Sequence, residues 1–139
     1  MPADEMRLRL SIIQANAGVR LMHNWLSQAI DTAADGSCPG IDLKVVAGWV
    51  TAMAGNPAFA SGNDHDQEVE PLLGKLALAN KDPDAALRHF NAALEAYVTP
   101  DTAARQVAMM ARAGAYPQAL AHLDHFESLQ RQVPAPARG

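Results

Sequence analysis

Apolar residues recur along most of the chain at spacings of three and four residues, the period of one face of an α-helix. The segments 19–34 and 43–53 show this pattern most clearly. In the first segment the apolar stripe comprises Met22, Trp25, Leu26, Ala29 and Ile30, and in the second it comprises Val46, Trp49, Val50 and Met53. Because apolar and polar residues do not alternate, the pattern predicts helices rather than strands.

Capping residues and helix breakers divide the pattern into about seven or eight helices. Asp42 is predicted to cap one helix, and Asp82 and Thr99, each followed by proline, are predicted to cap two more. The helices are expected over residues 4–17, 19–34, 43–53, 67–80, 83–94, 100–113 and 116–131, with a short turn near residue 59.

The second half of the chain repeats its apolar pattern after 33 residues. Ala86, Leu87 and Phe90 recur as Ala119, Leu120 and Leu123, and Ala93 returns as Phe126. A helix–turn–helix unit of about 33 or 34 residues is typical of helical repeat proteins. Alanines on the inner stripe let the two helices of a pair come close, and Phe90 is expected to fill the space toward the adjoining pair.

The unit over residues 67–100 resembles the tetratricopeptide repeat family. Residues at positions typical of that family are Leu73 and Gly74 in the first helix, and Ala86, Phe90, Ala93 and Leu94 in the second. Two positions depart from the family, because its usual aromatic is Ala77 and its turn glycine is Lys81. The resemblance implies an all-α fold, a right-handed stack of antiparallel helical hairpins whose first helices line the concave side.

A single helical domain is expected over residues 1–131. Its hairpins are irregular over 1–66, and its clearest repeats are 67–100 and 101–131. Residues 132–139 are rich in proline and alanine and are predicted to form a disordered tail. An ordinary helical bundle with an alanine-rich core remains the alternative, because periodicity alone does not distinguish the two architectures.

A second resemblance rests on four segments, "MRLRLSIIQANAG", "GWVTAMAGNPAFASG", "ALRHFNAALEA" and "AYPQALAHLDHF". They are similar to the soluble C-terminal region of bacterial O-antigen polymerase and protein O-oligosaccharyltransferase membrane enzymes. This resemblance implies a periplasmic accessory region that is tethered to a membrane domain in the native gene product. The catalytic residues of that family belong to the membrane part, so no catalytic role is carried over to this chain.

Composition narrows the classes of partner. Alanine occurs 28 times and aromatics make up only 5% of residues, which favours a helical interior of small and aliphatic side chains. A formal charge of −4 gives no basic footprint for nucleic acid. No apolar run reaches the roughly 18 residues of a membrane span. A chain that functions alone is expected in the cytoplasm, and the tail of a membrane enzyme in the periplasm.

Residues that could support catalysis or metal binding are scattered. His122 and His125 are three residues apart on one predicted helix, and they are interpreted as part of a solvated polar face. The loop containing Asp64, His65 and Asp66 lacks the spacing of a calcium loop. The single Cys38 excludes an internal disulfide and a cysteine metal site. No cofactor, metal site or catalytic group is therefore predicted, and a metal-dependent enzyme, which would bind zinc, is the third-ranked interpretation.

A peptide-binding surface is the better candidate. On the helix from Asp101, the predicted packing stripe is Ala104, Val107, Ala108 and Ala111. Arg105 and Arg112 are seven residues apart, which places them on one shared face with Met109 between them. With Lys75 of the preceding first helix they would form a basic strip for acidic side chains or a C-terminal carboxylate. The alternative is a solvated face.

The sequence therefore predicts a non-catalytic protein-interaction or scaffolding domain with a protein or peptide partner. Trp25 and Trp49 could also anchor a partner, but both lie on apolar stripes, so they are assigned to the core.

Overall fold

The computed structural model describes residues 21–36, 40–56 and 65–132, and within these ranges it contains helices and turns but no strand. A helix over 21–35 is followed by α2 (Leu43–Ala54), the π-helical turn η2 (His65–Val69), α3 (Glu70–Ala79), α4 (Pro83–Ala96), α5 (Pro100–Arg112) and α6 (Tyr116–Gln132). The predicted all-α class is confirmed. The expected helix over 4–17, the turn near residue 59, Cys38 and residues 133–139 of the expected tail lie outside the described ranges.

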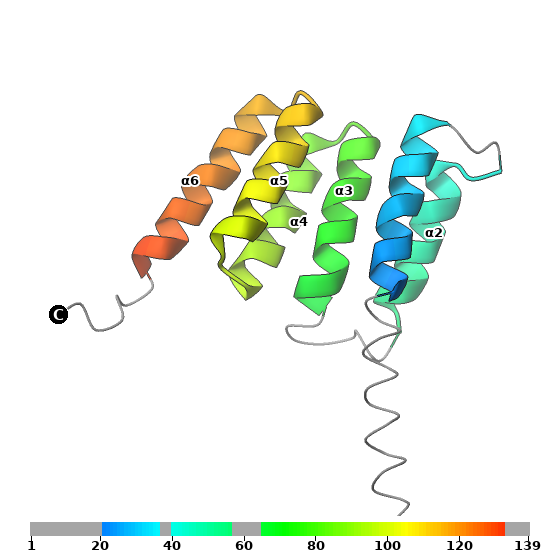
Figure 1. The fold of residues 1–139 in the computed structure, drawn as a ribbon, viewed down its shortest axis with the longest axis horizontal. Coiled ribbons are helices and arrows are strands. Elements are labelled where there is room, and N and C mark those ends of the chain that lie inside the picture. Colours follow the sequence, from blue (N-terminus) through cyan, green and yellow to red (C-terminus); the bar gives the residue numbers. More distant parts are fainter. Residues whose placement is uncertain (1–20, 37–39, 57–64, 133–139) are drawn as a thin grey trace, which may run out of the picture.

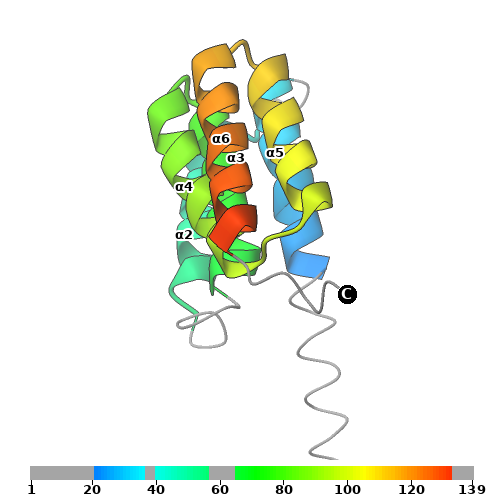
Figure 2. The same cartoon turned by 90° about the vertical axis from the view of Figure 1, so that its left-hand side faces the viewer.

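The helices lie side by side in a row that runs from the helix over 21–35 to α6 (Figure 1). Within this row α3 packs against α4, α5 packs against α6, and α4 also contacts α6. Seen along the row, α2 and α4 lie on one side of the molecule, and α5 and the helix over 21–35 lie on the other (Figure 2). Two layers of helices therefore form the domain.

The predicted caps begin three of the helices. The side chains of Asp42, Asp82 and Thr99 each accept a hydrogen bond from the backbone N–H three residues later, at 2.8, 3.2 and 3.2 Å. Pro83 and Pro100 occupy the first turns that follow, where no N–H is needed. The start of α2, α4 and α5 is thus encoded locally in the sequence.

Most of the predicted apolar stripe in the first half of the described chain is buried. One core cluster joins the helix over 21–35, α2 and α3, and its buried members are Leu26, Ala29, Ile30, Val46, Val50, Met53, Val69, Leu72 and Leu76. Trp49 packs against this cluster as predicted. The assignment of Trp25 to the core is wrong, because its side chain is 55% exposed and stacks on Trp49 with 5.1 Å between ring centroids.

The predicted packing stripe of α5 is only partly correct: Val107 is partly buried and packs against a core cluster, but the stripe as a whole is shifted by one residue. Ala104 and Ala108 are exposed, and the buried residues of α5 are Ala103, Gln106 and Met110. The alanine pattern is misleading because the true inward face includes a glutamine. Burial of a glutamine is tolerated only when its amide finds a hydrogen-bonding partner.

The repeat is only partly preserved in α6. Ala119 and Phe126 are buried as their counterparts in α4 are, but Leu120 and Leu123 are 60% and 39% exposed. Within the described chain α6 has neighbours only on the side of α4 and α5. One side of this helix therefore remains open, and Leu120 and Leu123 are exposed.

The closest contact between the helices of the middle pair joins Phe90 to Gly74. A Cβ atom added to Gly74 would lie 2.6–2.9 Å from three carbons of the Phe90 ring. The same ring is fully buried and also packs with Ala86, Met110 and Ala119. Phe90 thus fills the space toward the next helical pair, as predicted. Its ring also lies directly beside Gly74 of α3.

We expect Gly74→Ala to lower the free energy of unfolding by about 1–3 kcal/mol, because the added methyl group overlaps a buried ring that has little room to move. Urea denaturation followed by circular dichroism measures this change. Gly48→Ala is the matched control, since nothing lies within 4 Å of the added Cβ and alanine favours α2 by about 1 kcal/mol. Equal effects of the two substitutions would contradict this description of the packing.

The turn between α3 and α4 contains Lys81, at the position where tetratricopeptide repeats usually have a glycine. Lys81 has φ +62°, which is the left-handed region that disfavours side chains with a Cβ. The turn between α5 and α6 places Gly114 at φ +79°. The two turns therefore use the same backbone conformation, and only the second has the residue best suited to it.

Lys81→Gly is expected to stabilise the domain by about 0.5–1 kcal/mol, because it removes the left-handed strain at this turn. Gly114→Ala should have the opposite sign and a similar size. Both values come from urea midpoints at constant m-value. A destabilised Lys81→Gly variant would show that the lysine side chain contributes more than the strain costs.

Candidate functional site

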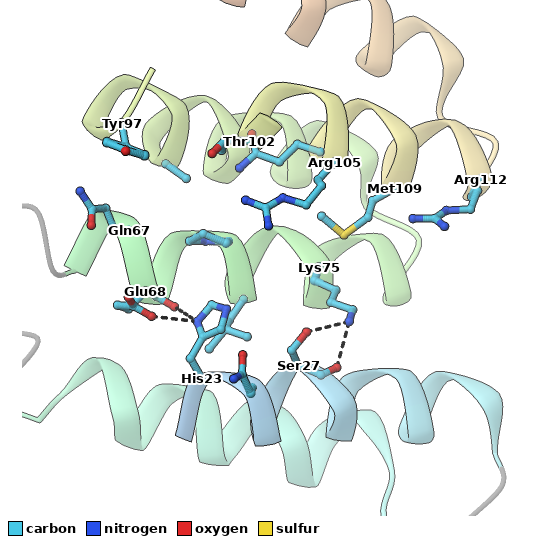
Figure 3. Close-up of a pocket in the computed structure, with 15 residues that line it drawn as sticks. His23, Ser27, Gln67, Glu68, Lys75, Tyr97, Thr102, Arg105, Met109 and Arg112 are labelled. Carbon is cyan, nitrogen blue, oxygen red and sulfur yellow. Dashed lines mark hydrogen bonds and ion pairs between the residues drawn. The ribbon is translucent and has the colours of Figure 1, made fainter. Parts of the chain in front are cut away.

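A cleft of about 530 Å³ opens between the helix over 21–35, α3 and α5. Figure 3 shows that its side chains come from several helices and converge on a common space. The lining residues are His23, Asn24, Ser27, Gln67, Glu68, Pro71, Leu72, Lys75, Ala93, Tyr97, Thr102, Arg105, Gln106, Met109 and Arg112. The lining mixes both signs of charge with apolar and aromatic surface.

All four residues predicted for peptide binding line this cleft: Lys75, Arg105, Met109 and Arg112. A second hollow of about 410 Å³ shares Lys75, Met109 and Arg112 with the first. Residues 30 sequence positions apart are thus brought together because α3 and α5 occupy equivalent places in successive helical pairs. Spacing along the sequence carries no information about this distance, which the packing of the helices decides.

Lys75 does not present a free ammonium group. Its Nζ donates to the backbone oxygen of Ser27 at 3.0 Å and to the Ser27 hydroxyl at 2.8 Å, and it forms an ion pair with Asp31 at 2.9 Å. An ammonium has three N–H donors, and here each has an acceptor. Lys75 therefore links α3 to the helix over 21–35 and contributes to the wall of the cleft.

Arg105 and Arg112 differ from Lys75 in this respect. Both side chains are exposed, and neither guanidinium has a hydrogen bond or ion pair with any residue in the described part of the chain. Met109, partly buried, lies between them on α5 (Figure 3). The predicted basic strip therefore reduces to two available arginines that flank an apolar side chain.

The other end of the cleft has a different chemistry, which the sequence analysis missed. His23 Nδ1 lies 2.8 Å from the backbone oxygen of Glu68 and 3.3 Å from its carboxylate. Tyr97, 58% exposed, adds an aromatic side chain just beyond the end of α4. No periodic signal marks Tyr97, because it follows the last helical residue of α4.

His122 contradicts the prediction of a solvated polar face. Its side chain is fully buried, with Nδ1 2.6 Å from the Asn91 amide and Nε2 2.6 Å from the Gln106 amide. Burial, aided by the nearby His125, lowers the pKa of His122 to about 4. A neutral imidazole donates at one nitrogen and accepts at the other, so one of the two amides turns its NH₂ group toward the ring.

His125 agrees with the prediction, since it is partly exposed and pairs with Glu95 at 2.9 Å. The two histidines therefore do not form a shared metal site. In the described part of the chain a different group brings metal-ligating atoms together: those of His65, Asp66 and Glu70 lie within 4.8 Å of one another.

No helix in the described ranges is both long enough and apolar enough to span a membrane. Comparison of the chain with known protein families, with curated proteins and with solved structures found no match. The resemblances to tetratricopeptide repeats and to membrane glycan-transferring enzymes therefore stay predictions, and the function is inferred from the site itself.

The buried histidine makes stability depend on pH. Because the pKa of His122 is about 4 in the folded chain and 6.5 in the unfolded chain, its contribution is complete above pH 6.5 and is lost as the pH falls toward 4. The loss amounts to up to about 3 kcal/mol. His122→Gln removes the titrating group, so the difference in unfolding free energy between wild type and variant should shrink from pH 7 to pH 4. A difference that is independent of pH would contradict a buried neutral imidazole.

Proposed function

We propose that this chain is a non-catalytic protein-interaction module of the tetratricopeptide type, a right-handed stack of helical hairpins that binds an acidic peptide segment in the cleft between α3, α5 and the helix over 21–35. The observation that carries the proposal is the convergence of Arg105, Met109 and Arg112 on one cleft. Three properties of the cleft support the proposal.

The first property is available charge. An arginine that has no partner among the described residues can form a bidentate pair with a carboxylate, which adds geometric specificity to the attraction. Arg105 and Arg112 stand two helical turns apart, about 10 Å along α5. In a polyproline II segment the side chains at i and i+3 share a face and lie about 9 Å apart, so one such segment could engage both guanidinium groups.

The second property is apolar surface beside the charges. Met109 is an adaptable side chain that packs against ligands of varied shape, and Tyr97 offers an exposed ring at the other end of the cleft. Such anchors supply binding energy, whereas exposed charges mainly select the partner and speed the encounter. An acidic segment whose two carboxylates are three residues apart and flank an apolar residue fits this arrangement best.

The third property is rigidity. Lys75 and its acceptors tie α3 to the helix over 21–35, so the two walls of the cleft are held together before a ligand binds. Binding to a preformed surface costs less conformational entropy than binding that must order the site.

The test is capture of peptides from a random library by the immobilised protein, with direct measurement of affinity for the selected sequences. We expect the selected peptides to be enriched in Asp and Glu. The double variant Arg105→Glu with Arg112→Glu should bind them at least tenfold more weakly, because attraction becomes repulsion at both positions.

Arg88→Glu with Arg131→Glu is a matched control. It makes the same change of charge at two arginines that do not line the cleft, and Arg131 occupies the last turn of α6 just as Arg112 occupies that of α5. Both double variants therefore lose a similar helix-dipole interaction of about 0.5 kcal/mol. Equal loss of binding in the two would show that only net charge matters, and unchanged binding in the cleft variant would refute the assignment.

A further inference from the structure

The start of α3 brings together side chains that the cleft does not use. His65 and Asp66 belong to η2, and Glu70 is the first residue of α3. His65 Nδ1 lies 3.4 Å from the Asp66 carboxylate and 3.8 Å from Oε1 of Glu70. In the described part of the chain this is the group of three metal-ligating residues whose donor atoms lie within 4.8 Å of one another.

The π-helical turn explains why these three side chains meet. In an α-helix, residues four apart share a face, and this spacing alone brings Asp66 and Glu70 to the same side. His65 is five residues from Glu70, and a turn with five-residue hydrogen bonding brings that spacing into line as well. Turns of this kind are rare and occur often at functional sites.

A fourth residue holds Glu70 from the side of α4. The Glu70 carboxylate pairs through Oε2 with His89 Nδ1 at 2.6 Å, while Oε1 is directed to His65. Carboxylates that bind metals are commonly fixed by such an outer hydrogen bond, which leaves the other oxygen to the ion. The side chain of Glu70 is only 15% exposed, whereas those of His65 and Asp66 are 30% and 43% exposed, so the group is reachable from solvent on one side.

We propose that His65, Asp66 and Glu70 form a binding site for a divalent transition-metal ion of the Zn²⁺ type, with His89 as the positioning residue for Glu70. One imidazole nitrogen and two carboxylate oxygens are ordinary zinc ligands, and they leave a fourth tetrahedral position for water or for a group from a partner. The imidazole ligand favours zinc over Mg²⁺ and Ca²⁺, which prefer oxygen donors throughout. The site is independent of the peptide cleft, since none of its residues lines that cleft.

Calorimetric titration of the metal-free protein with Zn²⁺ tests the proposal, with Co²⁺ as a spectroscopic probe and Mg²⁺ as the comparison ion. We expect one Zn²⁺ per chain, a tetrahedral Co²⁺ absorption spectrum and no binding of Mg²⁺. The dissociation constant should rise at least tenfold in His65→Ala and in Glu70→Gln, which remove ligands. It should rise by about 10-fold or more in His89→Gln, which removes the outer hydrogen bond.

His125→Ala is the matched control, because His125 also pairs with a glutamate on the neighbouring helix but has no third metal-ligating side chain beside it among the described residues. It should bind Zn²⁺ as the wild type does. Circular dichroism establishes that each variant is folded, and His65→Ala, on the exposed side of the group, tests the site even if a change at Glu70 unfolds the chain. Absence of saturable Zn²⁺ binding, or equal binding by wild type, His65→Ala and Glu70→Gln, would overturn the proposal.

Discussion

The arrangement of the described helices depends on the contact between the ring of Phe90 and the backbone of Gly74. No side chain separates the two, so α3 and α4 approach as closely as a helix and an aromatic ring allow. The same ring belongs to a core cluster with Met110 and Ala119, which are part of the next helical pair. Phe90 thus sets the spacing between α3 and α4 and also the position of the following pair, α5 and α6. It thereby sets the distance between α3 and α5, across which the cleft opens.

A second, polar connection stands beside this apolar one. His122 joins α6 to Asn91 of α4 and to Gln106 of α5, and its ring centroid lies 6.2 Å from that of Phe90. Gln106 also lines the cleft, between the turns of α5 that carry Arg105 and Met109. The floor of the cleft is therefore hydrogen-bonded to the interior, which fixes the rotation of α5 about its own axis and hence the direction of its arginines. A polar group buried in this way stabilises one orientation, because any other would leave it without a partner.

The segment formed by η2 and the start of α3 contributes side chains to two different surfaces. Glu68 is directed to His23 inside the cleft, while Glu70, two residues later, is directed to His89 on α4. Residues two apart on a helix face different sides, so neighbouring acids that look equivalent in sequence have unrelated surroundings. The proposed peptide cleft and the proposed metal site therefore share a structural element without sharing a residue.

The sequence by itself determined where three of the described helices begin, but not the π-helical turn before α3. Asp42, Asp82 and Thr99 start helices because a side-chain oxygen caps the amide three residues later, an interaction that needs no distant partner. It also identified the arginines of α5, since spacing along one helix is a local property. The burial of His122, the exposure of Trp25 and the grouping of His65 with Glu70 were decided only by the tertiary structure. Each depends on which neighbouring helix lies opposite a given face, and periodicity along one segment carries no information about that neighbour.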